Sequence, residues 1–186
     1  MTIIWAFCLA LGLGLLWAVL KARHLSFLAQ GPDDYAGGPP FDIRTRLAGP
    51  MICEGAIFGP TGRVVSRFVA DFHIRWDGDV GTMDEVFRYD SGTVQSRTWH
   101  LRLGNAGGIV ADAADLVGSG HGWQRGSAVQ LVYSIRLTEA AGGHVLHATD
   151  WMYLLENGTI VNRSQFRKFG IKVAELVATI RPRPMA

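Results

Sequence analysis

From Phe41 onward, apolar and polar residues alternate along the chain, and short clusters of Gly, Asn and Asp interrupt the alternation. Every second residue from Phe68 to Trp76 is apolar or aromatic, and the run from Val129 to Leu137 repeats the pattern. Such alternation places one face of a β-strand against a core and the other face in solvent. No window of comparable strength has the helical period, so the pattern predicts an all-β domain.

Turn signals divide this domain into strand-length runs. They are Gly59–Gly62, Asp77–Asp79, Asp90–Gly92, Gly104–Gly108, Gly118–Gly126, Ala141–Gly143 and Asn157–Gly158. Short connections between about eight to ten sequential strands favour an antiparallel up-and-down β-barrel, because closure removes the exposed edges that so many strands would otherwise have. A two-sheet sandwich is the alternative.

The N-terminal run from Thr2 to Leu20 carries no charged residue. As a helix it would be roughly 28 Å long, close to the ~30 Å hydrocarbon core of a bilayer. A cleaved signal peptide fits poorly, because the start lacks a basic residue and no Ala-x-Ala site precedes Lys21. A lipoprotein signal needs a Cys after the apolar run, whereas Cys8 lies inside it. We therefore predict one uncleaved transmembrane helix.

Three segments follow from this pattern. Residues 1–24 form a membrane anchor, residues 25–40 a linker rich in Gly and Pro, and residues 41–186 the β-barrel domain. The positive flank Lys21-Ala-Arg23-His24 predicts a single-pass protein of the inner membrane with its domain on the cytoplasmic face.

Composition narrows the function classes. With 48% hydrophobic residues, 18% charged residues and a net charge of +2, the chain is neither a disordered protein nor a dedicated nucleic-acid binder. The two cysteines, Cys8 and Cys53, predict no disulfide framework, and no His or Cys spacing indicates a metal site. No nucleotide-binding glycine loop is present, and we predict no cofactor.

The hairpin around Asp90-Ser91-Gly92 is the first candidate site. A three-residue loop with Gly in a positive-φ position places Glu85 opposite Arg97 and Met83 opposite Trp99, all on one face. If this face points inward, the two charges must pair, since an isolated buried charge is very costly. The pair serves as a polar clamp for a ligand head group or as a structural salt bridge.

The hairpin around Asn157-Gly158 is the second candidate site. A two-residue type I′ turn at Asn-Gly places Asp150 diagonal to Arg163 on one face, within reach of each other. The opposite face carries Trp151, Tyr153 and Asn162. The sequence does not indicate which face lines the interior, and a register-fixing ion pair explains Asp150 and Arg163 equally well.

The last strand supplies a third candidate, Glu175, within an otherwise apolar row. It lies at the rim of the barrel or meets a partner such as Arg97 or Arg163. A raised pKa would make Glu175 an acid-base candidate, as it would Glu85.

Several segments resemble a bacterial family known as domain of unknown function 3833. They are GRVVSRF, EVFRYDSG, RTWHL, DLVG, DWMYL, and VNR followed by KFG and Glu175. The resemblance covers about residues 49–181 and implies a compact lipocalin-like β-barrel. Similar proteins include many lipoproteins with an exported domain, so the resemblance leaves a periplasmic domain as the alternative, although this chain departs from them by its predicted span and by having no lipid-attachment Cys. Members tend to be encoded near fatty-acyl-modifying enzymes, which points to lipid chemistry.

Three functions follow from these observations. The first is a membrane-anchored barrel that binds a fatty-acyl or other lipid-like ligand through Arg97, Trp99, Asp150, Trp151, Tyr153, Asn162 and Arg163. The second is an enzyme acting on a fatty-acyl substrate, with Glu85 and Glu175 as catalytic candidates. The third is a non-catalytic accessory subunit of a lipid-modifying membrane enzyme.

Overall fold

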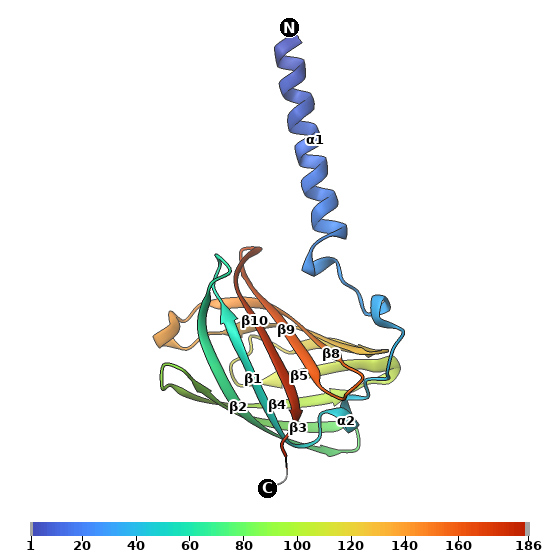
Figure 1. Ribbon diagram of the computed structural model, residues 1–186, viewed down its shortest axis with the longest axis vertical. Coiled ribbons are helices and arrows are strands. Elements are labelled where there is room, and N and C mark those ends of the chain that lie inside the picture. Colours follow the sequence, from blue (N-terminus) through green and yellow to red (C-terminus); the bar gives the residue numbers. More distant parts are fainter. Residues whose placement is uncertain (1, 185–186) are drawn as a thin grey trace.

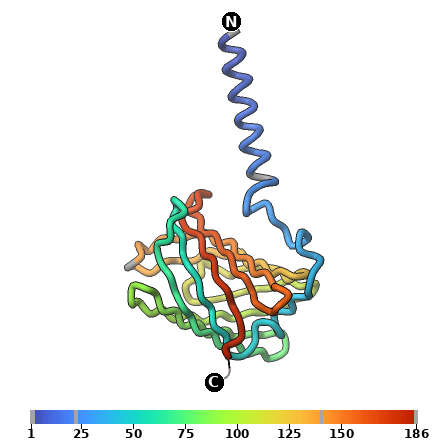
Figure 2. The backbone as a smooth tube through the Cα atoms, viewed as in Figure 1, coloured from blue at the N-terminus to red at the C-terminus, as the bar shows by residue number. Residues whose placement is uncertain are grey.

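A computed structural model describes residues 2–184 and shows a ten-stranded closed β-barrel with an N-terminal helix that projects from it (Figures 1 and 2). The strands are β1 Gly49–Phe58, β2 Val64–Asp77, β3 Val80–Tyr89, β4 Val94–Leu103, β5 Gly108–Ala113, β6 Gly120–Arg125, β7 Ala128–Arg136, β8 Val145–Leu154, β9 Ile160–Lys168 and β10 Ile171–Pro182. The helices are α1 Thr2–His24, α2 Ile43–Arg46 and the 3₁₀ turns η1 Phe27–Ala29, η2 Pro32–Tyr35, η3 Asn105–Gly107 and η4 Glu139–Ala141.

Each strand pairs antiparallel with its neighbours in sequence, and β1 pairs with β10 to close the barrel. The prediction of an up-and-down barrel is confirmed, and the sandwich alternative is wrong. The inward residues of β2 and β7 are those that the alternation selects, including the buried Phe68, Phe72, Leu131 and Ile135. The apolar period-two pattern therefore fixes which face of each strand points inward.

The β1–β2, β3–β4 and β8–β9 hairpins share one loop type: three residues with a left-handed glycine in the last position. These glycines are Gly62, Gly92 and Gly158, with φ of 79°, 84° and 82°. The predicted pairing of Glu85 with Arg97 and of Met83 with Trp99 is confirmed. The predicted type I′ turn at Asn157-Gly158 is wrong, since Asn157 does not have positive φ.

That turn changes the register of β9 by one residue. Met152 lies opposite Asn162 instead of Arg163, and Asp150 lies opposite Ser164 instead of Gln165. A shift of one residue moves every side chain to the other face of the sheet. Asp150 and Asn162 therefore share a face, whereas Arg163 lies on the opposite one.

The two-residue type I′ turn of the barrel lies between β9 and β10. Lys168 pairs with Ile171, and the central residues Phe169 and Gly170 have φ of 51° and 78°. A bulky residue in the left-handed region costs about 1 kcal/mol, so Phe169 is in an unfavourable backbone position.

The short helix α2 closes one end of the barrel. Its residue Ile43 and the following Leu47 are buried, and Asp42 caps it by accepting a hydrogen bond from the Arg44 backbone N–H. The Trp76 indole donates to the Leu47 carbonyl oxygen at 2.8 Å. The alternation did not predict this helix, because so short an element has no measurable period.

The segment before α2, predicted as a linker, packs on the outside of the barrel; we call Phe27–Phe41 the strap. Tyr35 lies with its ring centroid 5.2 Å from those of both Trp151 and Tyr153. Gln30 accepts hydrogen bonds from the hydroxyls of Tyr35 and Tyr153. The strap therefore covers β8 rather than hanging free.

Helix α1 lies outside the barrel. Its segment Ile3–Lys21 is long and apolar enough to cross a membrane and is not buried against the rest of the chain. A helix of this kind fits an anchor and also a signal sequence. Met1, Met185 and Ala186, which the predicted segments include, lie outside the described residues, as does the side chain of Arg23 in the positive flank.

Replacing Tyr35 with Ala is expected to lower the free energy of unfolding by about 2 kcal/mol, because Trp151 and Tyr153 lose their aromatic cover. Tyr35→Phe keeps the ring and removes one hydrogen bond, so it should cost only about 1 kcal/mol. Denaturant unfolding of the full chain in detergent measures both. Equal stability of Tyr35→Ala and wild type would show that the strap does not stabilise the barrel.

Candidate ligand-binding site

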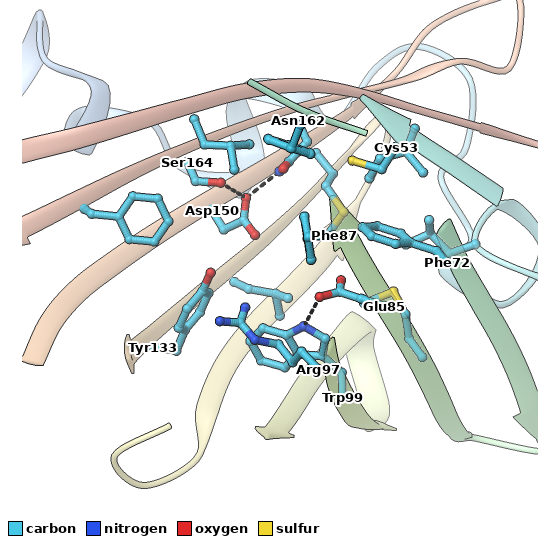
Figure 3. A pocket seen from close by; sticks show the side chains of 18 residues that line it. Cys53, Phe72, Glu85, Phe87, Arg97, Trp99, Tyr133, Asp150, Asn162 and Ser164 are labelled. Atoms are coloured by element: carbon cyan, nitrogen blue, oxygen red, sulfur yellow. Dashed lines mark hydrogen bonds between the residues drawn. The ribbon is translucent and has the colours of Figure 1, made fainter. Parts of the chain in front are cut away.

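The barrel encloses a cavity of about 100 Å³ (Figure 3). It extends from Leu47 at the end closed by α2 to Phe166 and Leu176, which lie on β9 and β10. Most of its lining is apolar, including Phe68, Phe72, Met83, Phe87, Leu131 and Met152. The same inward faces also carry a polar cluster: Glu85, Arg97, Trp99, Tyr133, Asp150, Asn162 and Ser164.

Glu85 is buried and accepts a hydrogen bond from the Trp99 indole N–H at 3.3 Å. Burial raises the pKa of Glu85 to about 8, outweighing the opposite effects of the Arg97 charge and the Trp99 hydrogen bond. The Glu85 carboxyl is therefore mostly protonated at neutral pH, and it can donate a hydrogen bond into the cavity.

Arg97 pairs with Asp115, not with Glu85 as predicted. Its Nε and Nη2 donate to Oδ2 of Asp115 at 3.0 and 2.5 Å, and its guanidinium lies 5.3 Å from the ring centroid of Trp99. Asp115 lies in the turn that follows β5, just beyond the point where the β4–β5 pairing ends at Trp99 and Ala113. The prediction that a charged partner accompanies a buried Arg97 was correct, but the partner comes from the next hairpin.

Asp150 is the second buried carboxyl group. Its Oδ1 accepts hydrogen bonds from the Ser164 hydroxyl at 2.6 Å and from the Asn162 amide (Figure 3). Burial raises the pKa of Asp150 to about 6, while these two hydrogen bonds and the Arg97 charge limit the increase. At neutral pH Asp150 is mostly ionised and serves as an acceptor.

Tyr133 completes the cluster. Its buried ring contacts Trp99 edge to face with a centroid separation of 5.2 Å. Burial raises the pKa of its hydroxyl well above the ordinary value, so this group stays protonated. Among the described residues, the Tyr133 hydroxyl has no hydrogen-bond partner, and it points into the space that Arg97 and Asp150 also face (Figure 3).

Four predicted site residues lie outside the cavity: Trp151, Tyr153, Arg163 and Glu175. Trp151 and Tyr153 are on the outer face of β8 under the strap, where Trp151 is buried by Tyr35. Arg163 is on the outer face of β9, and its guanidinium lies 5.0 Å from the Phe27 ring centroid. The predicted diagonal contact between Asp150 and Arg163 is therefore wrong.

Glu175 is also on the outer face. It accepts hydrogen bonds from Arg163 and Lys172, both at 2.7 Å. Partial burial tends to raise the pKa of Glu175, but the hydrogen bonds from Lys172, Arg163 and Gln165 together lower it. A carboxylate held ionised by two cations is poorly suited to general acid catalysis at neutral pH.

The sequence reasoning missed Asp115 and the polar role of Tyr133. Asp115 lies in the turn after β5, and no local pattern indicates that this turn brings it to Arg97. Within residues 2–184, no three His, Cys, Asp or Glu side chains lie close enough to hold a metal ion.

The cavity can accommodate one small molecule with both apolar and polar parts. Protonated Glu85 and Tyr133 supply donors, Arg97 supplies positive charge, and Asp150 supplies an acceptor. Two carboxyl groups with pKa values near 6 and 8 also lie in the range required for acid-base chemistry near neutral pH.

A closed antiparallel barrel with an internal cavity of this kind has a lipocalin-like fold. The chain belongs to the family described as protein of unknown function DUF3833, which matches residues 23–182. The sequence matches none of the curated proteins.

Two solved structures illustrate the fold similarity. Rv2717c from M. tuberculosis is 17% identical with a TM-score of 0.56, over 80% of this chain and 99% of that chain. The S-type phycobiliprotein lyase CPES from Guillardia theta is 8% identical with a TM-score of 0.56, over 84% of this chain and 99% of that chain. At these identities the similarity establishes the fold alone.

The Glu85 pKa predicts a pH-dependent stability. Between its ordinary value of 4.5 and about 8, Glu85 ionises in the unfolded chain but stays protonated in the folded one. The free energy of unfolding should therefore fall as pH rises through this range, by at most about 1.4 kcal/mol per pH unit. Glu85→Gln should lack this component of the fall, which urea unfolding in detergent across the range measures. Exposed Glu156→Gln is the control, and identical pH profiles for wild type and Glu85→Gln would contradict the raised pKa.

Replacing Arg97 with Met is expected to destabilise the barrel by about 3 kcal/mol, because Asp115 loses the partner of a largely buried ion pair. The double variant Arg97→Met, Asp115→Leu should recover much of this loss. A double-mutant cycle on unfolding free energies measures the coupling. A single-variant effect below about 1 kcal/mol, the range of exposed pairs, would place the pair in solvent.

Proposed function

We propose that this protein is a membrane-anchored barrel that binds a small, acyl-type carboxylic acid or carbonyl compound in its cavity. The observation that carries the proposal is that one cavity combines an apolar lining with a polar cluster in which Arg97 Nη1 and the Tyr133 hydroxyl have no partner among the described residues. Small barrels commonly hold one such ligand, and pockets of this class combine apolar walls with a few convergent polar groups.

The head group is expected to lie beside Arg97 and Tyr133. Arg97 uses Nε and Nη2 for Asp115, which leaves Nη1 without a partner among the described residues. The Tyr133 hydroxyl is likewise unpaired there, and protonated Glu85 adds a further donor. Three donors around one space favour an acceptor-rich head group such as a carboxylate or a carbonyl.

The apolar part of the ligand is expected to point towards Leu47, the lining residue contributed by the segment that closes the barrel. The volume of about 100 Å³ is below the roughly 300–1,000 Å³ typical of pockets for drug-sized ligands. The cavity therefore favours a short acyl chain. A longer chain requires Met83 and Met152, two flexible lining side chains, to change rotamer.

Anchoring by α1 is the other component of the proposal. The uncharged span, and the positive charge of Lys21 directly after it, support a single-pass protein of the inner membrane whose barrel faces the cytoplasm. A tether of this kind keeps the barrel close to lipid-derived molecules.

Binding can be measured by calorimetry on the full chain in nanodiscs, with straight-chain carboxylic acids of increasing length and the matching alcohols. Affinity should rise about fourfold per methylene until the cavity is filled, corresponding to about 0.8 kcal/mol per buried CH₂. Arg97→Lys keeps the charge but loses the planar guanidinium that holds Asp115 through Nε and Nη2 while Nη1 remains free for the ligand, so it should weaken acids more than alcohols.

Arg163→Lys is the matched control, because Arg163 lies on the outer face and should leave binding unchanged. Saturable binding that is unchanged by Arg97→Lys would remove Arg97 from the site. No saturable binding of either series, with no small molecule found by mass spectrometry of the purified chain, would overturn the proposal.

A second function is favoured by the pKa values of Glu85 and Asp150, about 8 and about 6 in one cavity. Such a pair suits an enzyme that moves protons on a bound acyl compound. Turnover of a bound acid or ester that is lost in Glu85→Gln, while binding persists, would establish the enzyme. Glu175→Gln is the control, since Glu175 lies outside the cavity.

A further inference from the structure

We propose that two hairpin tips of the barrel, β1–β2 at residues 59–65 and β9–β10 at residues 167–172, rest in the surface of the bilayer that α1 enters, with anionic phospholipid as their partner. We call these two segments the membrane tips. The inference shares with the proposed function only the anchoring by α1, and it does not depend on ligand binding.

Large apolar side chains at the membrane tips are exposed. Phe169 is 92% exposed, Ile171 69% and Val65 65%. Scattered exposed apolar residues are common on protein surfaces, but here they occupy the two adjacent hairpin tips joined through the β1–β10 pairing. Protruding aromatic and aliphatic side chains of this kind suit insertion among lipid head groups and upper acyl chains.

Phe169 is also held in a backbone conformation that it does not favour. A type I′ turn prefers Asn or Gly at its first central position, yet Phe occupies it with φ of 51°. Backbone strain at an exposed turn is an observation that points towards function, because the Phe169 ring lies in solvent and contacts the neighbouring Lys168 rather than the core of the barrel.

The charge of the membrane tips matches an anionic surface. Arg63, Arg167, Lys168 and Lys172 lie in them, and neither segment contains Asp or Glu, although Lys172 pairs with Glu175 just outside them. Basic residues near a negatively charged leaflet contribute attraction that adds to the insertion of apolar side chains.

The strap gives the barrel a defined orientation relative to α1. It is held by a hydrogen bond from the Phe41 N–H to the Gly126 carbonyl at 2.7 Å, by the Tyr35 contacts, and by Arg163 against Phe27. Figure 1 shows that the β1–β2 and β9–β10 tips are the parts of the barrel that extend towards the level of the lower end of α1, and Figure 2 shows the same. A bilayer around α1 would therefore meet these tips first.

The position of the cavity agrees with this orientation. Phe166, which lines it, is three residues before Phe169, whereas α2 closes the opposite end. The barrel end that carries the membrane tips is therefore the end that α2 does not cover.

The test uses the full chain in nanodiscs that contain anionic and zwitterionic phospholipid. In a Cys8→Ser background, a bimane label is attached at Phe169→Cys and quenched by lipids that carry a nitroxide near the top of the acyl chain. Cys53 is buried and should not react. We expect strong quenching at position 169. Glu156→Cys, at the exposed β8–β9 turn on the other end of the barrel, should show almost none.

In a second experiment the label is attached at Ile171→Cys, and quenching is compared between the chain with Phe169 and the chain with Phe169→Asn. Asn suits the left-handed position, so this variant should fold at least as well as wild type while losing much of the quenching at position 171. Discs of zwitterionic lipid alone should reduce the quenching in the same way. Equal quenching at positions 169 and 156, or quenching at 171 that neither change alters, would overturn the proposal.

Discussion

Closure of the barrel by the β1–β10 pairing is the constraint on which the rest of the structure depends. A closed sheet separates its inward side chains from water, so each ionisable carboxyl or guanidinium group inside must find a partner or change its protonation state. Arg97 finds Asp115, Asp150 finds Ser164 and Asn162, and Glu85 becomes protonated. The chemistry of the cavity is thus a consequence of closure.

The inside of the barrel is readable from sequence where a strand alternates and its turn is correctly recognised. Both conditions held for β3 and β4, so the positions of Glu85 and Arg97 were predictable. They failed for β8 and β9, where Asn157-Gly158 suits two loop types that differ by one residue in register. The turn that does have type I′ geometry contains Phe169-Gly170, which its sequence does not suggest.

Contacts between distant segments were beyond the reach of local patterns. Asp115 lies in the turn after β5, and its contact with Arg97 of β4 depends on the path of that turn, which no local pattern indicates. The strap consists of residues typical of a linker, yet Tyr35 covers Trp151 and Tyr153, which lie on the outer face of β8. These two aromatic residues were predicted as ligand contacts because several aromatic and polar residues lie close together in this hairpin. In the structure they pack against the strap of the same chain.

The two ends of the barrel differ in the physical chemistry of what they expose. At one end, α2 and Leu47 cover the core, and the Leu47 carbonyl is satisfied by Trp76. At the other end, Phe169 and Ile171 remain in solvent beside cationic residues, and no described segment of the chain packs over them. A protein that can bury one end with a single helical turn does not need to leave the other apolar, so the asymmetry favours an external apolar partner. Because α1 emerges on the side of the barrel that carries the membrane tips, we propose the bilayer as that partner.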